Sequence, residues 1–351
     1  MALNLFAKTY LAYHQSTSLP DPPEFLICEA DPARAEAFLD ALKQKGGQEL
    51  RSRANIVGSG KEHVDVESVY LDPQTGILAG IPDSAPALTP ESTSLTFDGA
   101  EDSDGEGFAS SAGEPATGKP HTLLIDGTTL DPTAAIRIAE TIHEKTQGGA
   151  AMLDAPVSGG IVAAEAGQLT IMFGSPSLHA SSLAIPFLQR MARKDGVIAC
   201  GGNGAGVGVK VCNNLILAIN QIGLAEGLAL GKSLGIEPTL LHNVINTSSG
   251  QSWSSRVNTP LAEVPNSPGS RGFSGGFQSR LMLKDVGLAL SAAHTCDLPT
   301  PLGWAAKSVY DEVCKEDDGA WASKDFSVVL EWLKRKQEQG VERGWKDGKS
   351  E

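Results

Sequence analysis

Short apolar runs alternate with amphipathic segments over the first 203 residues. A run at residues 24–29 (EFLICE) predicts a strand, and residues 32–45 predict a helix that Asp31 caps and Gly46 ends. Further strands are predicted at 121–126, 151–154, 168–174 and 196–200, with a helix at 132–146. Alternating strands and helices are typical of a parallel, doubly wound sheet, so this part of the chain is expected to form an α/β domain.

The pattern changes after Gly202. Residues 206–234 form one long helical segment whose apolar positions cover most of its circumference, and Gly235 and Pro238 end it. Such a helix is expected to run between domains or into a subunit interface. The rest of the chain, as far as Leu333, predicts further helices and no clear strand. We therefore predict two domains, an α/β domain at 1–203 and an all-helical domain at 204–351.

Residues 82–120 differ in composition from the rest of the α/β domain. They are rich in Ser, Gly, Pro and Ala, and they hold eight acidic residues against one basic residue, Lys119. A segment with so few large apolar residues cannot offset the entropy lost on ordering it. It is predicted to be a disordered surface insertion, and deletion of about residues 89–116 is expected to leave thermal stability nearly unaltered. An acidic docking segment is the functional alternative.

The overall charge and the cysteines limit the classes of partner and compartment. A net charge of −14 and a pI near 5.0 disfavour nucleic acid and anionic membrane surfaces, which attract a surplus of Lys and Arg. No stretch approaches the roughly 18 unbroken apolar residues that a membrane-spanning helix needs. The five cysteines contain no CxxC pair, which argues against a disulfide framework or a zinc cluster and favours a reducing compartment.

The first motif with chemical content is residues 154–160, DAPVSGG, directly after a predicted strand. Open α/β sheets bind their ligands at the carboxyl ends of strands. The backbone N–H groups of Ser158, Gly159 and Gly160 can converge on an anion without interference from Cβ atoms, and Ser158 adds a hydroxyl. A Ser-Gly-Gly sequence by itself is more often only a turn.

The second motif is residues 204–214, GAGVGVKVCNN, at the start of the long helix. Lys210 and Asn214 are four residues apart and therefore project from one helix face, with Asn213 beside them. Polar side chains on an apolar helix are costly unless they are satisfied, which suggests a polar cleft. An isolated lysine that extends to the surface is the alternative interpretation.

The third motif is residues 275–288, GGFQSRLMLKDVGL, which contains Phe277, Lys284 and Asp285. A Lys-Asp pair on a helix surface explains the last two residues as well as a functional pair does. Between the second and third motifs, residues 248–255 (SSGQSWSS) contain Trp253, which fits either a site or an ordinary core position.

Together these motifs resemble the β-hydroxyacid dehydrogenases, and residues 248–255 are most similar to the 3-hydroxyisobutyrate dehydrogenase branch. The resemblance is continuous over about residues 123–333. It implies a Rossmann-like, doubly wound parallel sheet followed by an all-helical C-terminal domain. It also implies NAD-dependent oxidation of 3-hydroxyisobutyrate to methylmalonate semialdehyde in valine catabolism, without a metal ion.

The resemblance assigns roles to individual residues. Lys210 corresponds to the catalytic lysine, and the substrate-binding positions are Ser158, Gly159, Gly160, Asn213 and Asn214. The cofactor-binding positions are Thr128, Thr129, Phe277, Lys284, Asp285 and Glu29. Glu29 follows the second strand, where an acid accepts hydrogen bonds from a ribose 2′-OH and repels a 2′-phosphate, so NAD is favoured over NADP.

The start of the chain departs from the family pattern. Residues 1–5 (MALNL) match the helix after the family's GxGxMG loop, while the first strand and that loop are not found. A usual strand ending in MLP is also not recognisable, and residues 54–59 stand in its place. Because a glycine loop and a helix N-terminus normally hold the pyrophosphate, we expect the α/β domain to be incomplete and to bind NAD weakly.

Other functions remain open at this stage. One is a catalytically inactive family member that acts as a partner protein, and another is a related 3-hydroxyacid or semialdehyde reductase. The resemblance further implies a homo-oligomer, either a dimer or a tetramer, and a mitochondrial location, with the cytoplasm as the alternative.

Overall fold

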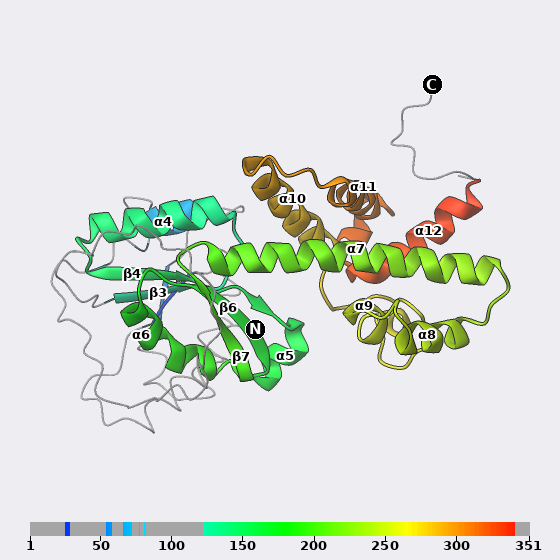
Figure 1. Ribbon diagram of the computed structural model, residues 1–351, viewed down its shortest axis with the longest axis horizontal. Coiled ribbons are helices and arrows are strands. Elements are labelled where there is room, and N and C mark those ends of the chain that lie inside the picture. Colours follow the sequence, from blue (N-terminus) through cyan, green and yellow to red (C-terminus); the bar gives the residue numbers. More distant parts are fainter. Residues whose placement is uncertain are drawn as a thin grey trace. The chain divides into compact units, whose positions relative to one another are not determined.

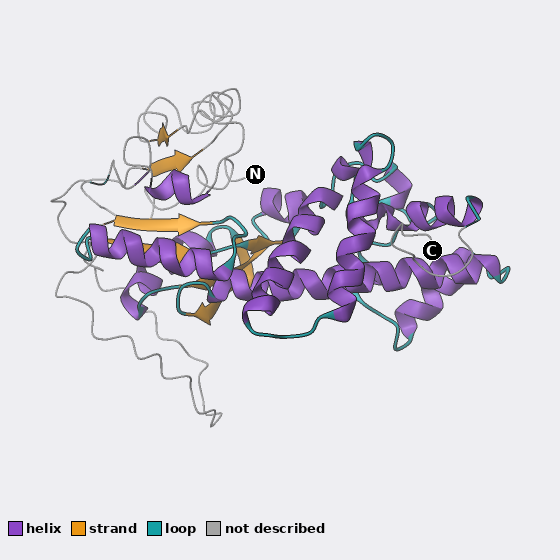
Figure 2. Cartoon of the chain, turned by 90° about the horizontal axis from the view of Figure 1, so that it is seen from above, coloured by secondary structure: helices purple, strands orange, loops and turns teal. Residues whose placement is uncertain are grey.

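The computed structural model describes residues 122–340, together with 25–28, 54–57, 66–71, 77 and 81. It divides into two units. The sheet unit holds the described residues up to Thr128 and Pro132–Gly206, and the helical unit holds Thr129–Asp131 and the described residues from Val207 onward. Along the chain, the main division between the two units falls after Gly206. Figure 2 shows the strands in the sheet unit, and only helices and loops in the described part of the helical unit.

The main sheet of the sheet unit has five strands in the order β3, β4, β6, β5, with β7 paired to β6. These strands are β3 (Thr122–Asp126), β4 (Ala150–Asp154), β5 (Val157–Ser158), β6 (Leu169–Gly174) and β7 (Ala192–Gly201). The pairs β3–β4 and β6–β7 are parallel, and Asp126 lies opposite Asp154 where the first pair ends. The predicted Rossmann-like α/β class is confirmed, and β7 begins earlier than the sequence pattern indicates.

The sheet is mixed, however, and not wholly parallel as predicted. β4 meets β6 in antiparallel orientation at Asp154 and Gly174, and β5 pairs antiparallel with β6. The cause is the short connection between β5 and β6, which contains only the helix α5 (Gly160–Ala166) and a turn. A parallel crossover needs roughly a dozen or more residues, so a connection of this length reverses the chain instead.

Two further strands, β1 (Phe25–Cys28) and β2 (Ala54–Val57), pair in parallel as a separate two-stranded sheet. A short helix, α3 (Val66–Leu71), follows them in sequence. The strand predicted around residues 24–29 is confirmed as β1. The predicted helix at 32–45, the insertion at 82–120, Glu29 and residues 1–5 all lie outside the described residues.

Helices cover both faces of the main sheet, as a doubly wound arrangement requires. In Figure 1, α4 (Pro132–Lys145) and α6 (Leu178–Gln189) lie on opposite sides of β3 and β4. Every residue of β4 is buried. Its Ala151 and Leu153 share a core cluster with Ala180, Ala184 and Leu188 of α6. A strand buried on both faces is apolar at successive positions, which explains its continuous apolar sequence.

The helical unit contains six α-helices among its described residues: α7 (Ala205–Ser233), which begins in the sheet unit, α8 (Pro238–Thr247), α9 (Trp253–Arg256), α10 (Ser279–Thr295), α11 (Pro301–Lys315) and α12 (Val329–Glu338). Short 3-10 helices, among them Phe326–Val328, connect them. The core is built around Met282, Tyr310 and Phe326, which are completely buried. The predicted all-helical C-terminal domain is therefore confirmed.

Among the described residues, α7 alone is long and apolar enough to cross a membrane by length and composition. The central helix of a soluble protein meets the same criterion. Ala218, Ala225 and Leu228 of α7 belong to the core of the helical unit, and its Asn214 and Gln221 are buried polar residues. We therefore interpret α7 as the core helix of this unit.

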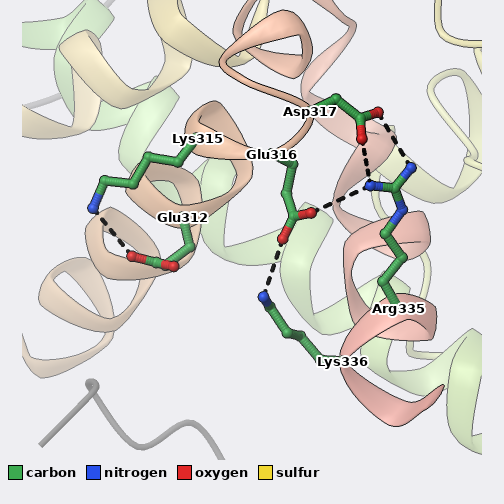
Figure 3. A network of polar contacts seen from close by, with 6 residues as sticks. All are labelled: Glu312, Lys315, Glu316, Asp317, Arg335 and Lys336. Carbon is green, nitrogen blue, oxygen red and sulfur yellow. Dashed lines mark hydrogen bonds and ion pairs between the residues drawn. The ribbon is translucent and has the colours of Figure 1, made fainter. Parts of the chain in front are cut away.

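A network of charges joins the last helix to the end of α11 (Figure 3). Arg335 on α12 donates hydrogen bonds to Asp317 and Glu316, and Lys336 forms an ion pair of 3.0 Å with Glu316. The Arg335 guanidinium also lies 4.3 Å from the ring centroid of Trp321. Through these contacts α12 packs against the residues that follow α11 and against Trp321.

Candidate active site

Lys210 is buried near the start of α7, with 7% of its surface exposed. This excludes the interpretation that it extends to the surface. Burial lowers the pKa of Lys210 from its ordinary value, Asp285 opposes this by raising the pKa, and Lys284 lowers it further. A lysine with a lowered pKa carries a larger fraction of neutral amine, the form that can accept a proton.

Asn214 lies one helical turn beyond Lys210 and is also buried. Its Nδ2 donates a hydrogen bond of 2.6 Å to Oδ2 of Asp285, and its Oδ1 accepts one of 3.1 Å from Asn213 Nδ2. Because a carboxylate has no hydrogen to donate, the Nδ2 end of the Asn214 amide is the one that faces Asp285 on α10. Asn213 itself is exposed.

Lys284 and Asp285 are neighbours on α10 with different surroundings. The Asp285 side chain is 4% exposed and the Lys284 side chain is 47% exposed, with 3.3 Å between their charged atoms. Lys284 Nζ also donates to the backbone carbonyl oxygen of Thr129. The pair is therefore more than a surface ion pair, because one member is buried and the other holds the segment Thr129–Asp131 in the helical unit.

Phe277 lies in the loop before α10 and is half-buried. Lys210 Nζ is 6.0 Å from the centroid of its ring. This distance is at the outer limit of a cation–π contact. The ring also forms an edge contact with Phe326, with 6.0 Å between the centroids. Phe277 thus links the candidate lysine to the core of the helical unit.

In the sheet unit, polar groups gather where β3 ends. Asp126 accepts two hydrogen bonds of 3.0 Å from Thr128, one from its backbone N–H and one from its hydroxyl. Gly127 and Thr128 are exposed. The carboxyl ends of β3 and β4 form the edge at which open α/β sheets bind ligands, so this turn has the location expected for a cofactor contact.

The Ser158–Gly160 turn begins with the last residue of β5 and ends with the first residue of α5. Ser158 is half-buried and pairs with Thr170 of β6, while Gly159 and Gly160 are exposed with φ values of 132° and 69°. Neither glycine carries a Cβ that could screen its own backbone N–H group. The geometry is compatible with a ligand at this turn.

The glycines at the start of α7 have a packing reason. A Cβ on Gly206 would lie 2.7 Å from the carbonyl oxygens of Asp154 and Met172, so only glycine allows this approach to β4 and β6. The buried Asp154 side chain accepts a hydrogen bond of 2.8 Å from the Gly204 N–H. These contacts fix the beginning of α7 on the sheet, four residues before Lys210.

The structure brings together one group of predicted site residues in the helical unit: Lys210, Asn213, Asn214, Phe277, Lys284, Asp285 and Thr129. Thr128 and Ser158–Gly160 belong to the sheet unit, and Glu29 lies outside the described residues. Trp253 is 52% exposed, so it is not an ordinary core residue. Sequence reasoning missed Asp154 as an anchor and missed the buried Asp325; the Asp325-Phe-Ser sequence, typical of a capping turn, was the available signal.

Two family models match the chain. The model described as the NAD-binding of NADP-dependent 3-hydroxyisobutyrate dehydrogenase matches residues 204–333. The model described as the NAD binding domain of 6-phosphogluconate dehydrogenase matches residues 106–202. The boundary between the matches, at residues 202 and 204, lies at the start of α7.

Named relatives agree with these matches. A probable mitochondrial 3-hydroxyisobutyrate dehydrogenase of Arabidopsis thaliana is 44% identical over 59% of this chain and 60% of its own length. An NAD-dependent L-serine dehydrogenase of Pseudomonas aeruginosa is 43% identical over 60% of this chain and 68% of its own length. The chain thus spans less than two thirds of the plant relative.

A solved structure extends the similarity to three dimensions. The 3-hydroxyisobutyrate dehydrogenase of Mycobacterium tuberculosis, solved with L-serine, is 37% identical and has a TM-score of 0.56. The match covers 62% of this chain and 71% of that protein.

Proposed function

The chain belongs to the 3-hydroxyisobutyrate dehydrogenase family, and from this premise we propose that it oxidises the primary alcohol of a small 3-hydroxy acid with NAD. The observation that carries the proposal is the buried Lys210, whose pKa is lowered by burial and which stands beside an Asn214 amide fixed by Asp285. A buried amine with a specific charged partner is typical of an acid–base catalyst.

Lys210 is the proton acceptor in this proposal. The substrate hydroxyl donates a hydrogen bond to Lys210 Nζ and transfers its proton to the amine as the carbonyl group forms. When NAD is bound, it supplies the acceptor for the hydride that leaves the carbinol carbon. In the reverse direction the lysine ammonium returns the proton to the carbonyl oxygen.

The remaining polar groups bind and orient the substrate. Asn214 orients the hydroxyl, with Asn213 beside it, and the turn at Ser158–Gly160 binds the carboxylate through its N–H groups and the Ser158 hydroxyl. The exposed positive-φ glycines support this role for the turn.

The residues at the end of β3 fit a nicotinamide cofactor, since Gly127 and Thr128 are exposed at the carboxyl edge of a parallel strand pair. Thr128, Thr129, Phe277 and Lys284 would contact it. Asp285 acts on the cofactor side through Lys284, because its own side chain is buried against Asn214. The preference for NAD over NADP depends on Glu29.

We propose 3-hydroxyisobutyrate as the substrate, which would place the reaction in valine catabolism. L-Serine is the second candidate, because a relative of comparable identity is named an L-serine dehydrogenase. Both molecules are 3-hydroxy acids with a carboxylate for the Ser158–Gly160 turn. They differ in the substituent at the carbon between the two groups, which is apolar in one and an ammonium in the other.

We also propose a homo-oligomer in the mitochondrion. Exposed apolar side chains on α7 and α8, including Ile216, Leu230, Leu240 and Val244, support an interface between subunits. The location rests on the name of the plant relative. Light scattering after size-exclusion chromatography measures the oligomeric state, and imaging of the tagged protein in its own cells tests the mitochondrial location.

The decisive experiment measures NADH formation with 3-hydroxyisobutyrate and L-serine as substrates, and repeats it with NADP. The proposal expects turnover with NAD and a higher kcat/KM for 3-hydroxyisobutyrate. Calorimetric titration with NAD accompanies the assay. NAD binding without turnover on any 3-hydroxy acid would instead favour an inactive member that acts as a partner protein.

A further inference from the structure

Asp325 is a completely buried carboxylate at the start of the 3-10 helix Phe326–Val328. Its Oδ1 accepts hydrogen bonds from Asn258 Nδ2 at 3.0 Å, from the Ser327 N–H at 3.0 Å and from Ser327 Oγ at 2.6 Å. Its Oδ2 accepts one of 3.1 Å from the Phe277 N–H. These donors are all neutral, so the charge is stabilised by oriented dipoles.

The backbone around Asp325 is joined to the loop that precedes α10. Asp325 N–H donates to the Phe273 carbonyl at 2.9 Å, and Phe326 N–H donates to the Phe277 carbonyl at 2.9 Å. Gly276 has a φ of 70°, and a Cβ there would lie 2.0 Å from Asp325 Oδ2. The loop therefore passes so close to the carboxylate that only glycine fits before Phe277.

We propose that Asp325 is a positioning residue that holds the Phe277 ring against the Lys210 amine. The carboxylate fixes the Phe277 N–H, the adjacent backbone contact fixes the Phe277 carbonyl, and the ring then lies 6.0 Å from Lys210 Nζ. The expected effect on turnover rests on the proposed dehydrogenase function, whereas the placement of the Phe277 ring by Asp325 is independent of it.

An amide at this position cannot replace the carboxylate. In Asp325→Asn one oxygen becomes an NH₂ group, which must face either the Phe277 N–H or the Ser327 N–H and hydroxyl. Either orientation sets a donor against a donor. The two carboxylate oxygens are needed together because donors approach from both sides.

The release of Phe277 has a predictable effect on Lys210. Burial is the main cause of the lowered pKa of Lys210, with charged neighbours Asp285 and Lys284 on α10. Water admitted beside the amine relieves that burial, so the pKa of Lys210 rises toward its ordinary value in Asp325→Asn. Asp285 and Lys284 are unchanged in this variant.

The experiment follows the acetylation of Lys210 by acetic anhydride as a function of pH, read by mass spectrometry of its peptide, with the more exposed Lys284 as internal reference. Asp325→Asn should move the Lys210 labelling curve to higher pH and leave the Lys284 curve in place. Turnover should fall by about 10²-fold, as for a substitution away from the reacting atoms that misplaces the site by about 1 Å. An unmoved Lys210 curve in folded Asp325→Asn overturns the proposal.

Two further variants separate positioning from general stability. Ser327→Ala removes one bond to Oδ1 and leaves the Phe277 contact intact, so it should keep the wild-type labelling curve. Phe277→Leu should shift the curve as Asp325→Asn does, and the double variant should show no added shift. If Asp325→Asn does not fold, an unshifted curve in Phe277→Leu refutes the proposal. Acetylation of Lys210 can be measured without enzyme turnover. If the acetylation curve shifts as expected in a protein that has no dehydrogenase activity, only the proposed function is rejected and the role of Asp325 stands.

Discussion

The two units present their polar groups in different ways. In the sheet unit the candidate ligand contacts are backbone N–H groups and short side chains on turns, at the exposed Thr128, the half-buried Ser158 and the exposed Gly159 and Gly160. In the helical unit they are ionisable side chains with very little exposed surface, Lys210 and Asp285, supported by the buried Asp325. Groups of the first kind bind without changing protonation state, whereas the pKa of Lys210 is lowered chiefly by its burial.

Under the proposed function we therefore expect the turns of the sheet unit to bind the substrate carboxylate and Lys210 of the helical unit to transfer the proton. Substitutions of Lys210 and of the charged residues beside it should change the maximal rate or its pH dependence. Substitutions in the exposed turns should change mainly the concentration of substrate needed.

The largest effect is expected for Lys210→Ala. Removal of the proton acceptor should lower kcat by about 10²- to 10⁴-fold, because a positioned acid or base contributes about that factor. Steady-state kinetics at saturating NAD measure it. Lys232→Ala, at the exposed end of the same helix, is the matched control and should keep the wild-type rate. A Lys210→Ala enzyme with the wild-type rate would place proton transfer outside α7.

Sequence reasoning singled out this lysine because residues 204–214 resemble the family's lysine motif, while the spacing of Lys210 and Asn214 on one helix face is a local pattern. It also found the strands β3, β4 and β6, whose apolar runs are local too. The antiparallel joint between Asp154 and Gly174 could not be predicted in this way, since it depends on how a short connection folds back. The contacts of Asp325 span 48 and 67 residues in sequence, and no local pattern reports them.

A smaller effect is expected in the sheet unit for Ser158→Ala. The hydroxyl is one donor among several at the turn, and a hydrogen bond to a charged group is worth about 1.5–3 kcal/mol. The KM for the hydroxy acid should therefore rise by about 10- to 150-fold, with kcat changed less. Gln168→Ala, on the exposed turn between α5 and β6, is a control for local disturbance. A loss confined to kcat would contradict the assignment of this turn to carboxylate binding.

The neighbours of Lys210 provide a test with two opposite signs. Asp285 raises the pKa of Lys210 and Lys284 lowers it. The oxidation rate should rise with pH as the amine becomes neutral, so this limb of the pH profile follows the pKa of Lys210. Asp285→Asn should move the limb to lower pH, and Lys284→Met should move it to higher pH.

The pH dependence of kcat/KM at saturating NAD measures both shifts. Asp285→Asn also weakens the contact with Asn214 and should lower the rate. The test therefore uses the pH at which kcat/KM rises and not the maximal value that it reaches. Shifts in the same direction in both variants would show that the limb does not report Lys210.

The smallest effect is expected for Arg335→Met. This variant tests whether a charged residue of the helical unit affects turnover because it is buried or simply because it lies in that unit. Arg335 pairs with Asp317 and Glu316 on the surface of the helical unit (Figure 3). Exposed ion pairs contribute little to stability and are screened by salt. Methionine keeps an apolar chain over the Trp321 ring, so the variant removes mainly charge. Turnover and the position of the pH limb should be unchanged, and the melting temperature should fall slightly at low salt only.

Arg335 holds the pKa of the Asp317 carboxyl below its ordinary value. A carboxyl whose pKa is depressed on folding stabilises the protein above its unfolded-state pKa and loses that contribution as pH falls through the folded-state value. The difference between variant and wild type should therefore be present at neutral pH and vanish in acid, as measured by thermal melts at several pH values. A large loss of turnover in Arg335→Met would mean that position in the helical unit, and not burial, decides which charges matter.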